Sequence, residues 1–202
     1  MKYNSMKGFG RNLNKRQEQK EQRRKKILSV SLDLFIRKGY NATKISDIAE
    51  KAGMSMGLFF NYFESKERVY EELVGIGLTG TKRSIEFDQE NPLAFFETAA
   101  SMVFTMLEEN PDSAKIFVLM AQAQHNEYAP QSVKEMLLKV DNIQLSISLI
   151  KAGQENRTIR EGNPEALSTA FWCSIKGIAE QLALYPNTPP AEANWIVDIL
   201  RK

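Results

Sequence analysis

The placement of the prolines constrains the fold of this chain more than any other feature. All seven lie beyond residue 90, and three directly follow asparagine, at Asn91-Pro92, Asn110-Pro111 and Asn163-Pro164. An asparagine side chain accepts a hydrogen bond from a free N–H of a first helical turn, and proline suits the first helical position because its missing N–H has no partner there. Each pair therefore predicts the start of a helix, and Pro130 and Thr188-Pro189 predict two more.

Apolar residues between these marks recur every three or four positions, which is the spacing of one helix face. Three segments show this pattern, about residues 95–106, 133–150 and 167–182. No segment shows the sustained alternation of β-branched and polar residues that strands show. We therefore predict an all-α fold.

Composition narrows the classes of protein that this chain can represent. Its 202 residues are 43% apolar and 26% charged, as in ordinary globular proteins. With one cysteine, Cys173, and one histidine, His125, it has neither an internal disulfide pair nor a Cys/His zinc site. We expect no cofactor and no metal. Without a long apolar run or a signal-peptide core, we expect a cytoplasmic protein that does not enter a membrane.

The net charge of +2 hides an asymmetry along the chain. Residues 1–70 contain 16 Lys and Arg against 7 Asp and Glu, whereas residues 71–202 contain 11 against 18. A basic first third favours contact with a polyanion such as DNA, and a solvated basic face is the alternative.

The basic third divides into a tail and a domain. Residues 1–22 are polar and are predicted to form a flexible basic tail, followed by a helix from about Arg23 to Lys38 that Gly39 ends. We assign residues 23–68 to a DNA-binding domain and residues 69–202 to a second, helical domain. The tail and the basic residues that follow it contact DNA as a basic arm, or they are simply solvated.

Residues 39–66 contain the motif that indicates function. Ile45, Ile48 and Ala49 form one short amphipathic helix that ends at Gly53, and Ser55 can cap a second helix over 56–62. Two short helices joined by a tight turn are a helix-turn-helix, whose second helix enters the major groove of DNA.

The stretch from about Lys25 to Leu73 resembles the N-terminal DNA-binding domain of the tetracycline-repressor (TetR) family of bacterial transcriptional regulators. The residues that carry the resemblance are Leu34-Phe35, Gly39-Tyr40, Ala42-Thr43, Ile48-Ala49, Ala52-Gly53-Met54-Ser55, Gly57, Phe59-Phe60, Tyr62-Phe63 and Lys66. The resemblance implies a three-helix domain of this kind, followed by a helical domain that binds an effector and forms a dimer.

The resemblance also implies roles for single residues. Thr43, Tyr62 and Lys66 are expected to contact phosphates, and Lys44 to reach the DNA backbone. Ser55 is expected to cap the recognition helix first and to contact a phosphate second.

The groove-facing side of the recognition helix carries no charge. We expect this side to present Met56, Leu58 and Asn61, with contacts to methyl groups, an Asn61–adenine pair or DNA shape supplying specificity. Phe60 stands where the family usually has tyrosine, and a phenylalanine cannot donate to a phosphate. Phe59 and Phe63 are predicted to be core residues.

Two motifs that would indicate a nucleotide-binding site or an enzyme lack the context that such sites need. Gly75–Gly80 matches GxGxxG, but it follows a helical pattern instead of a strand, so we expect these glycines to loosen a helix. His125 and Cys173 form a dyad only if folding joins them, and the chain contains no GxSxG or HExxH motif. We predict that the protein is not an enzyme.

The second domain offers residues for an effector pocket and for a homodimer interface. Pocket candidates are Met102, Phe104, Met106, Phe117, Met120, Gln124, His125 and Trp172, with core packing as the alternative for each. For the dimer we propose the helix around 164–185, with its small face of Ala170, Cys173 and Gly177, and a last helix over 190–201 with Trp195, Ile196 and Ile199. An ordinary intrachain core is the alternative.

The whole pattern predicts a homodimeric repressor that binds near-palindromic double-stranded DNA and is released by an unknown small-molecule effector. The alternative is a helical ligand-binding or interaction module whose helix-turn-helix no longer reads DNA.

Overall fold

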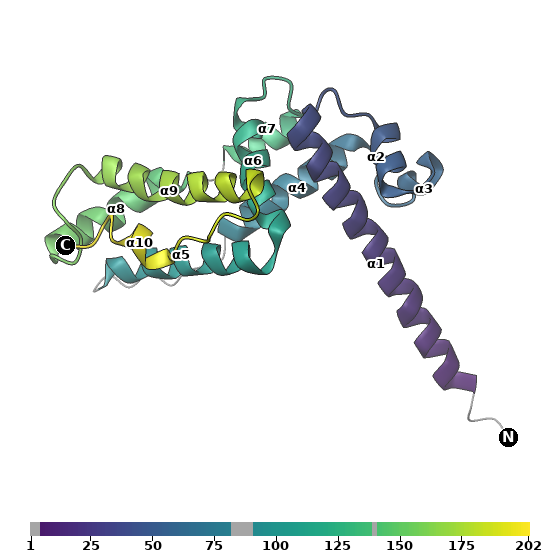
Figure 1. The fold of residues 1–202 in the computed structure, drawn as a ribbon, viewed down its shortest axis with the longest axis horizontal. Helices are drawn as coiled ribbons and strands as arrows, with labels where there is room; N and C mark the ends of the chain where they lie inside the picture. The colour runs from purple at the N-terminus through teal and green to yellow at the C-terminus, as the bar shows by residue number, and fades with distance from the viewer. Residues whose placement is uncertain (1–4, 82–90, 139–140) are drawn as a thin grey trace. The chain divides into compact units, whose positions relative to one another are not determined.

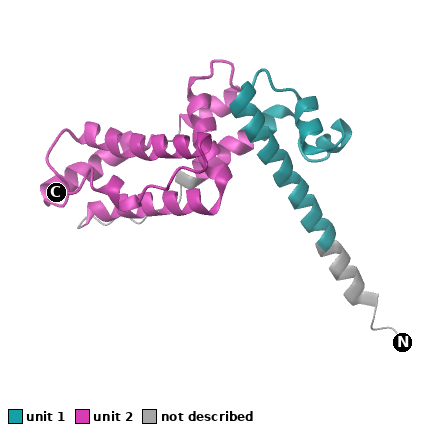
Figure 2. Cartoon of the chain, viewed as in Figure 1, with its two compact units in different colours: residues 1–70 teal, residues 71–202 magenta. Residues whose placement is uncertain are grey.

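The computed structural model describes residues 5–81, 91–138 and 141–202, and these ranges contain helices and no strand. The chain divides into two compact units, unit 1 over Met1–Tyr70 and unit 2 over Glu71–Lys202 (Figure 2). Figure 1 labels the helices in chain order. Their bounds are α1 Ser5–Lys38, α2 Ile45–Ala52, α3 Met56–Phe60, α4 Lys66–Thr81, α5 Pro92–Glu109, α6 Pro111–His125, α7 Gln131–Leu137, α8 Asn142–Glu155, α9 Pro164–Leu184 and α10 Ala193–Val197.

The start of α1 corrects one expectation. The helix begins at Ser5, so residues 5–22 are helical where a flexible tail was expected. For the part from residue 15 onward, the reason is that residues 15–26 consist entirely of Lys, Arg, Gln and Glu. These straight-chain residues lose little side-chain freedom in a helix and extend it without burial. The predicted end at Lys38 is confirmed, with Gly39 at a φ of 82° directly after it.

In unit 1 the helix-turn-helix forms as the sequence predicted. Gly53 ends α2 in the left-handed conformation, with a φ of 68°, and allows the tight turn into α3. The Ser55 side chain then caps α3 by accepting a hydrogen bond from the Leu58 backbone N–H at 3.2 Å. Phe59, at 0% exposure, and Phe63 belong to the core of the unit, as predicted.

In unit 2 the three asparagine–proline pairs all begin helices. The side chains of Asn91, Asn110 and Asn163 accept hydrogen bonds from first-turn N–H groups of α5, α6 and α9. Pro130 directly precedes α7, as expected. The apolar segment over 133–150 is divided between α7 and α8, because Asp141 caps a new helix by accepting from the Gln144 N–H.

The C-terminal prediction was wrong in two respects. No helix begins at Thr188-Pro189, and α10 spans only Ala193–Val197 instead of 190–201. Pro190 explains the delay, because a proline disfavours helical geometry in the residue before it. After α10, an isolated antiparallel bridge joins Ile159 and Arg201.

The core of unit 2 is built from α5, α8, α9 and the C-terminal segment. Phe96 and Phe171 lie in its centre with their ring centroids 5.0 Å apart in an edge-to-face arrangement. Ile175 of α9 and Ile196 of α10 are buried in the same cluster. These side chains therefore stabilise the monomer by packing within it, whatever partner the chain has.

The glycines that were expected to loosen α4 lie in a helix that runs without interruption to Thr81, and one of them, Gly77, permits close packing. A Cβ placed on Gly77 would lie 2.8 Å from the Met120 sulfur and 3.0 Å from the Ile116 side chain. A side chain larger than that of glycine at this position would therefore require Met120 and Ile116 of α6 to shift. No helix in the described part of the chain is long and apolar enough to cross a membrane.

Candidate nucleic-acid interface

Helix α3 presents an uncharged, partly apolar surface to solvent. Met56 is 49% exposed and Phe60 is 47% exposed, whereas Phe59 between them is fully buried. Asn61, directly after the helix, is also exposed, and a Cβ on Gly57 would meet nothing within 4 Å. We name Met56, Gly57, Phe60 and Asn61 the α3 face. Exposed large apolar side chains that gather in one place mark a contact surface.

The other residues predicted around α3 are less exposed or already engaged. Leu58 and Tyr62 are half-buried, and the exposed Ser55 uses its hydroxyl oxygen for the cap. The Phe60 ring lies edge-to-face on Phe59 with centroids 5.6 Å apart, which fixes its position on the α3 face.

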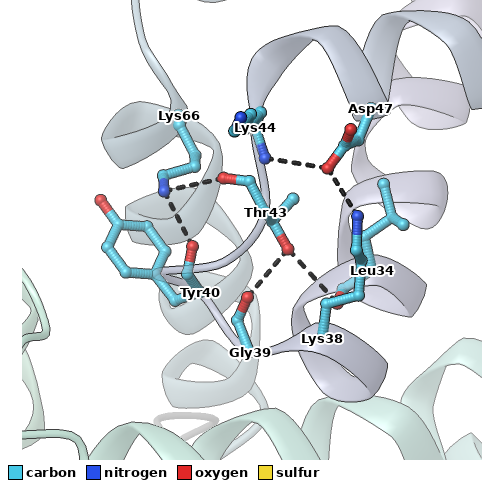
Figure 3. A network of polar contacts seen from close by, with 8 residues as sticks. All are labelled: Leu34, Lys38, Gly39, Tyr40, Thr43, Lys44, Asp47 and Lys66. Carbon is cyan, nitrogen blue, oxygen red and sulfur yellow. Dashed lines mark hydrogen bonds and ion pairs between the residues drawn. The ribbon is translucent and has the colours of Figure 1, made fainter.

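The predicted phosphate contacts Thr43 and Lys66 are both engaged within unit 1 (Figure 3). Thr43 is 1% exposed, and its hydroxyl donates to the Gly39 carbonyl at 2.8 Å. The Lys66 ammonium donates to the carbonyls of Tyr40 at 2.8 Å and Thr43 at 2.9 Å, and it lies 4.3 Å from the centroid of the Tyr40 ring. Partial burial lowers the pKa of Lys66 below its ordinary value. Together these bonds tie the loop between α1 and α2 to the start of α4.

A second set of polar contacts fixes the ends of this loop. The Tyr40 hydroxyl donates to the Glu67 carboxylate at 2.9 Å. Hydrogen bonds from its own backbone N–H, and then from the Ser65 and Tyr40 hydroxyls, hold the pKa of Glu67 below its ordinary value.

Lys44, at the start of α2, is exposed. Its backbone N–H donates to the Asp47 carboxylate at 3.2 Å, and Asp47 also pairs with Lys38 at 2.7 Å. The hydrogen bond from Lys38, followed by that from Lys44, lowers the pKa of Asp47. These contacts set the orientation of α2, which carries α3.

Sequence reasoning missed these supporting residues. Asp47 was detectable from the sequence. It is the third residue of α2, and an acidic side chain at this position commonly accepts a hydrogen bond from the backbone N–H of the N-cap residue, here Lys44. Tyr40 and Glu67 were not, since 27 residues separate them and no local spacing relates them.

The pocket candidates are spread over several environments. Phe117 and Trp172 pack against the core of unit 2, and the Trp172 indole N–H donates to the Ser146 hydroxyl at 3.0 Å. Met120 lies against Gly77, and Phe104 is buried in the core. Met102 and Met106 are half-buried on α5, whereas Gln124 and His125 are exposed at the end of α6. An open depression on α9, lined by Asn163, Glu165, Ala166, Thr169 and Ala170, includes none of them.

Metal-binding chemistry finds no candidate within the described ranges, where no three His, Cys, Asp or Glu side chains lie close enough to hold an ion. His125 ends α6, and Cys173 is exposed on α9.

Comparison with known proteins places this geometry in a family. The sequence-family model described as bacterial regulatory proteins, tetR family, matches residues 27–73. The HTH-type transcriptional regulator YhgD of Bacillus subtilis is 28% identical over 183 residues, covering 88% of this chain and 92% of its own length.

Solved structures agree on the fold. A TetR family transcriptional regulator from Chloroflexus aurantiacus superposes with a TM-score of 0.62 at 16% identity, covering 90% of this chain and 94% of its own. The structure of AibR in complex with isovaleryl coenzyme A and operator DNA gives a TM-score of 0.60 at 13% identity, with 87% and 94% covered. Since the family match falls on the segment from within α1 to within α4, residues 27–73 form a DNA-binding helix-turn-helix domain of the tetR family of bacterial regulatory proteins, and the chain is similar over most of its length to transcriptional regulators.

Proposed function

We propose that this protein is a homodimeric repressor that binds near-palindromic operator DNA through α3 and leaves it when a small molecule binds unit 2. The observation that carries the proposal is the α3 face, where Met56, Phe60 and Asn61 stand exposed on a capped helix inside a TetR-family domain. Leaving these apolar side chains exposed forgoes the stabilisation that their burial would give, which favours a role in contact with a partner.

The chemistry of the α3 face favours particular bases. Without Arg or Lys on α3, guanine is not read by the usual bidentate contact. Met56 and Phe60 suit the methyl group of thymine, and the Asn61 amide can pair with N6 and N7 of adenine. An A·T-rich half-site is therefore expected, with Lys44, Tyr62 and Ser55 on the flanking phosphates.

Thr43 and Lys66 receive a different role in this proposal. Their polar atoms hold the loop that precedes α2, so they position the recognition unit and do not themselves provide the main phosphate contacts. Substituting them is expected to weaken DNA binding through loss of order in unit 1.

A two-fold dimer would present two α3 helices to half-sites about 34–36 Å apart. Support for the dimer comes from α9, whose small residues Ala170, Cys173 and Gly177 are all exposed. Small exposed residues allow two helices to approach closely. Trp195, at 56% exposure, and the exposed Leu184 and Tyr185 add apolar area in the same unit.

Effector binding is proposed for unit 2 around the half-buried Met102, Met106, Phe117, Met120 and Trp172. The structure of AibR, which has this fold, contains both isovaleryl coenzyme A and operator DNA. It supports the proposal that a protein of this fold can bind a small molecule as well as DNA. Helix α4 is the proposed connection, since its first turn belongs to unit 1 and its remainder to unit 2. A coupling free energy of about 1–3 kcal/mol would change operator affinity roughly 5–150-fold.

The decisive experiment selects binding sites from a random duplex library and then measures affinity by fluorescence anisotropy. Phe60→Ala and Asn61→Ala should each weaken binding to the selected site by about 1–3 kcal/mol. The matched control is Tyr128→Ala, which removes another exposed aromatic ring, from unit 2. A library that yields no enriched sequence, or a Tyr128→Ala loss equal to that of Phe60→Ala, would contradict the proposal and favour a helix-turn-helix that no longer reads DNA.

The dimer has its own test. Gly177→Arg introduces a long charged side chain at the centre of the small face, where a Cβ meets nothing within the monomer. Sedimentation should change from dimer to monomer with helicity unchanged, whereas Ser148→Arg on the exposed surface of α8 should leave the dimer intact. A Gly177→Arg protein that remains a dimer would exclude this face.

A further inference from the structure

Residues 15–26 of α1 carry a charge pattern that the proposed function does not use. Residues 15–26 consist only of Lys, Arg, Gln and Glu, and all of them are exposed except the half-buried Arg24. In Figure 1, α1 continues well past α2 and α3, so these residues belong to a helix that leaves the body of its unit.

The charges are sorted onto two sides of this helix. At 3.6 residues per turn, Lys15, Arg16, Lys20, Arg23 and Lys26 all fall on one half of the circumference. We name these five residues the basic stripe. Both acidic residues, Glu18 and Glu21, fall on the opposite half together with Lys25. Glu21 and Lys25 are four apart, the spacing of a helix-stabilising pair.

Two contacts show which side of α1 the basic stripe occupies. The Lys26 ammonium lies 3.8 Å from the position that a Cβ on Gly53 would take, which places it beside the turn between α2 and α3. Arg24, at the edge of the same half, has its guanidinium 4.9 Å from the centroid of the Phe63 ring, just beyond α3. The basic stripe therefore continues along the side of α1 that faces the helix-turn-helix.

We propose that the basic stripe is a second DNA-binding surface, which contacts phosphates flanking the base pairs read by α3. The inference rests on the proposed function and deepens it. The stripe is about 16 Å long at 1.5 Å per residue, a length over which duplex DNA carries several phosphates. Because the segment is helical before binding, fewer conformations are lost on contact than a flexible tail would lose.

Duplex DNA fits the stripe better than an anionic lipid surface does. A helix that lies on a membrane needs a large apolar face to insert below the headgroups. Residues 15–26 contain no apolar side chain at all. Their chemistry is that of charge alone, which suits a phosphate backbone.

The test compares two triple variants of the full-length protein with equal loss of charge. The stripe variant carries Arg16→Gln, Lys20→Gln and Arg23→Gln. The control variant carries Lys25→Gln, Lys151→Gln and Lys202→Gln, from the opposite side of α1 and from unit 2, all exposed. Glutamine keeps the helix propensity of these positions, and circular dichroism verifies that helicity is unchanged.

Each protein is titrated with the selected site in two lengths, one trimmed to its half-sites and one with ten flanking base pairs on each side. On the long duplex, the stripe variant should lose about one unit of salt slope per phosphate contact removed, up to about three in all. Its affinity at 100 mM salt should fall roughly 10-fold or more, while its preference over a scrambled duplex stays unchanged. On the trimmed duplex it should match the control variant.

The outcomes separate the inference from the proposed function. If the stripe variant and the control variant bind the long duplex equally, the basic stripe is a solvated face and the inference is overturned. If stripe-dependent binding is seen only with phosphatidylserine vesicles, the surface belongs to lipid and the inference is again overturned. A wild-type protein without preference for any sequence would instead refute the proposed function.

Discussion

The two units differ in the kind of interaction that holds their key elements in place. In unit 1, a short loop is positioned by directional bonds, from Lys66 to two carbonyls and from Thr43 to a third. In unit 2, the central elements are positioned mainly by contact between apolar surfaces, with Phe96 on Phe171 and Met120 on Gly77, and the hydrogen bond between the buried hydroxyls of Ser146 and Ser168 is added to them. Polar bonds specify an orientation, whereas apolar packing tolerates replacement by other residues of similar volume.

This difference matches the task proposed for each unit. A DNA-reading helix needs one orientation, and small errors there remove base contacts. A unit that binds an effector needs an adaptable interior, which methionine and aromatic side chains supply. The contrast can be tested with substitutions in both units. A substitution in the core of unit 2 should lower stability, whereas one on the α3 face of unit 1 should weaken DNA binding.

The largest expected difference is in stability, between one substitution in unit 2 and one in unit 1. Phe171→Ala removes a fully buried ring and should lower the free energy of unfolding by about 3–5 kcal/mol. Phe60→Ala removes a half-exposed ring and should change stability little while weakening DNA binding. Urea unfolding and anisotropy on the same proteins measure both quantities. Equal loss of stability in the two variants would remove the distinction between them.

Lys66→Met should lower stability by about 1.5–3 kcal/mol, because two carbonyls lose their charged hydrogen-bond donor. Hydrogen exchange should locate the loss in unit 1, around residues 39–48. Lys151→Met, at an exposed position on α8, is the control and should have little effect. A Lys66→Met protein of unchanged stability, with a salt slope reduced by one, would instead identify Lys66 as a phosphate contact.

Thr43→Val keeps the shape of the side chain and removes its hydroxyl, so about 0.5–1.5 kcal/mol of stability should be lost. Thr43→Ser, which retains the hydroxyl, should recover most of the lost hydrogen bond. Thr105→Val on the exposed side of α5 serves as the comparison. Thermal unfolding followed by circular dichroism is sufficient to rank the three. A Thr43→Val protein as stable as wild type would show that the buried hydroxyl contributes nothing.

The smallest effect concerns pH. Because the pKa of Glu67 and that of Asp47 are lowered in the folded protein, both carboxylates stabilise unit 1 above their unfolded pKa values, 4.5 and 3.8. That contribution is lost as the pH falls through the folded values. Urea midpoints between pH 6 and pH 3 should therefore fall less steeply for Glu67→Gln than for wild type. Glu64→Gln, at an exposed position, should follow wild type; identical curves for all three proteins would refute the coupling.

The sequence predicted those features that depend on neighbouring residues. Asparagine–proline pairs and the Gly53 turn are local, so the helix starts and the helix-turn-helix followed from spacing alone. The extension of α1 was missed because its signal is propensity without apolar periodicity. The late start of α10 follows from Pro190, which disfavours helical geometry in the residue before it.

The sequence predicted exposed residues on the recognition helix but not the hydrogen bonds that hold the domain around it. The sequence predicted Met56, Leu58 and Asn61 on the outer side of α3; in the structure Met56 and Asn61 are exposed, whereas Leu58 is half-buried. The engagement of Lys66 with carbonyls 23 and 26 residues away depends on how α4 packs against the loop. No local sequence pattern predicts that tertiary contact.

The shortness of α3 has a consequence for how long the regulator survives in a cell. Five residues are far below the roughly 12–15 that an isolated helix needs, so α3 persists only while its cap and the burial of Phe59 in unit 1 hold it. A ligand that binds only the folded state stabilises it, by about 2.7 kcal/mol at a concentration one hundred times its Kd. Operator DNA would thus protect the bound regulator from proteolysis, and molecules released from it would be the first to be degraded.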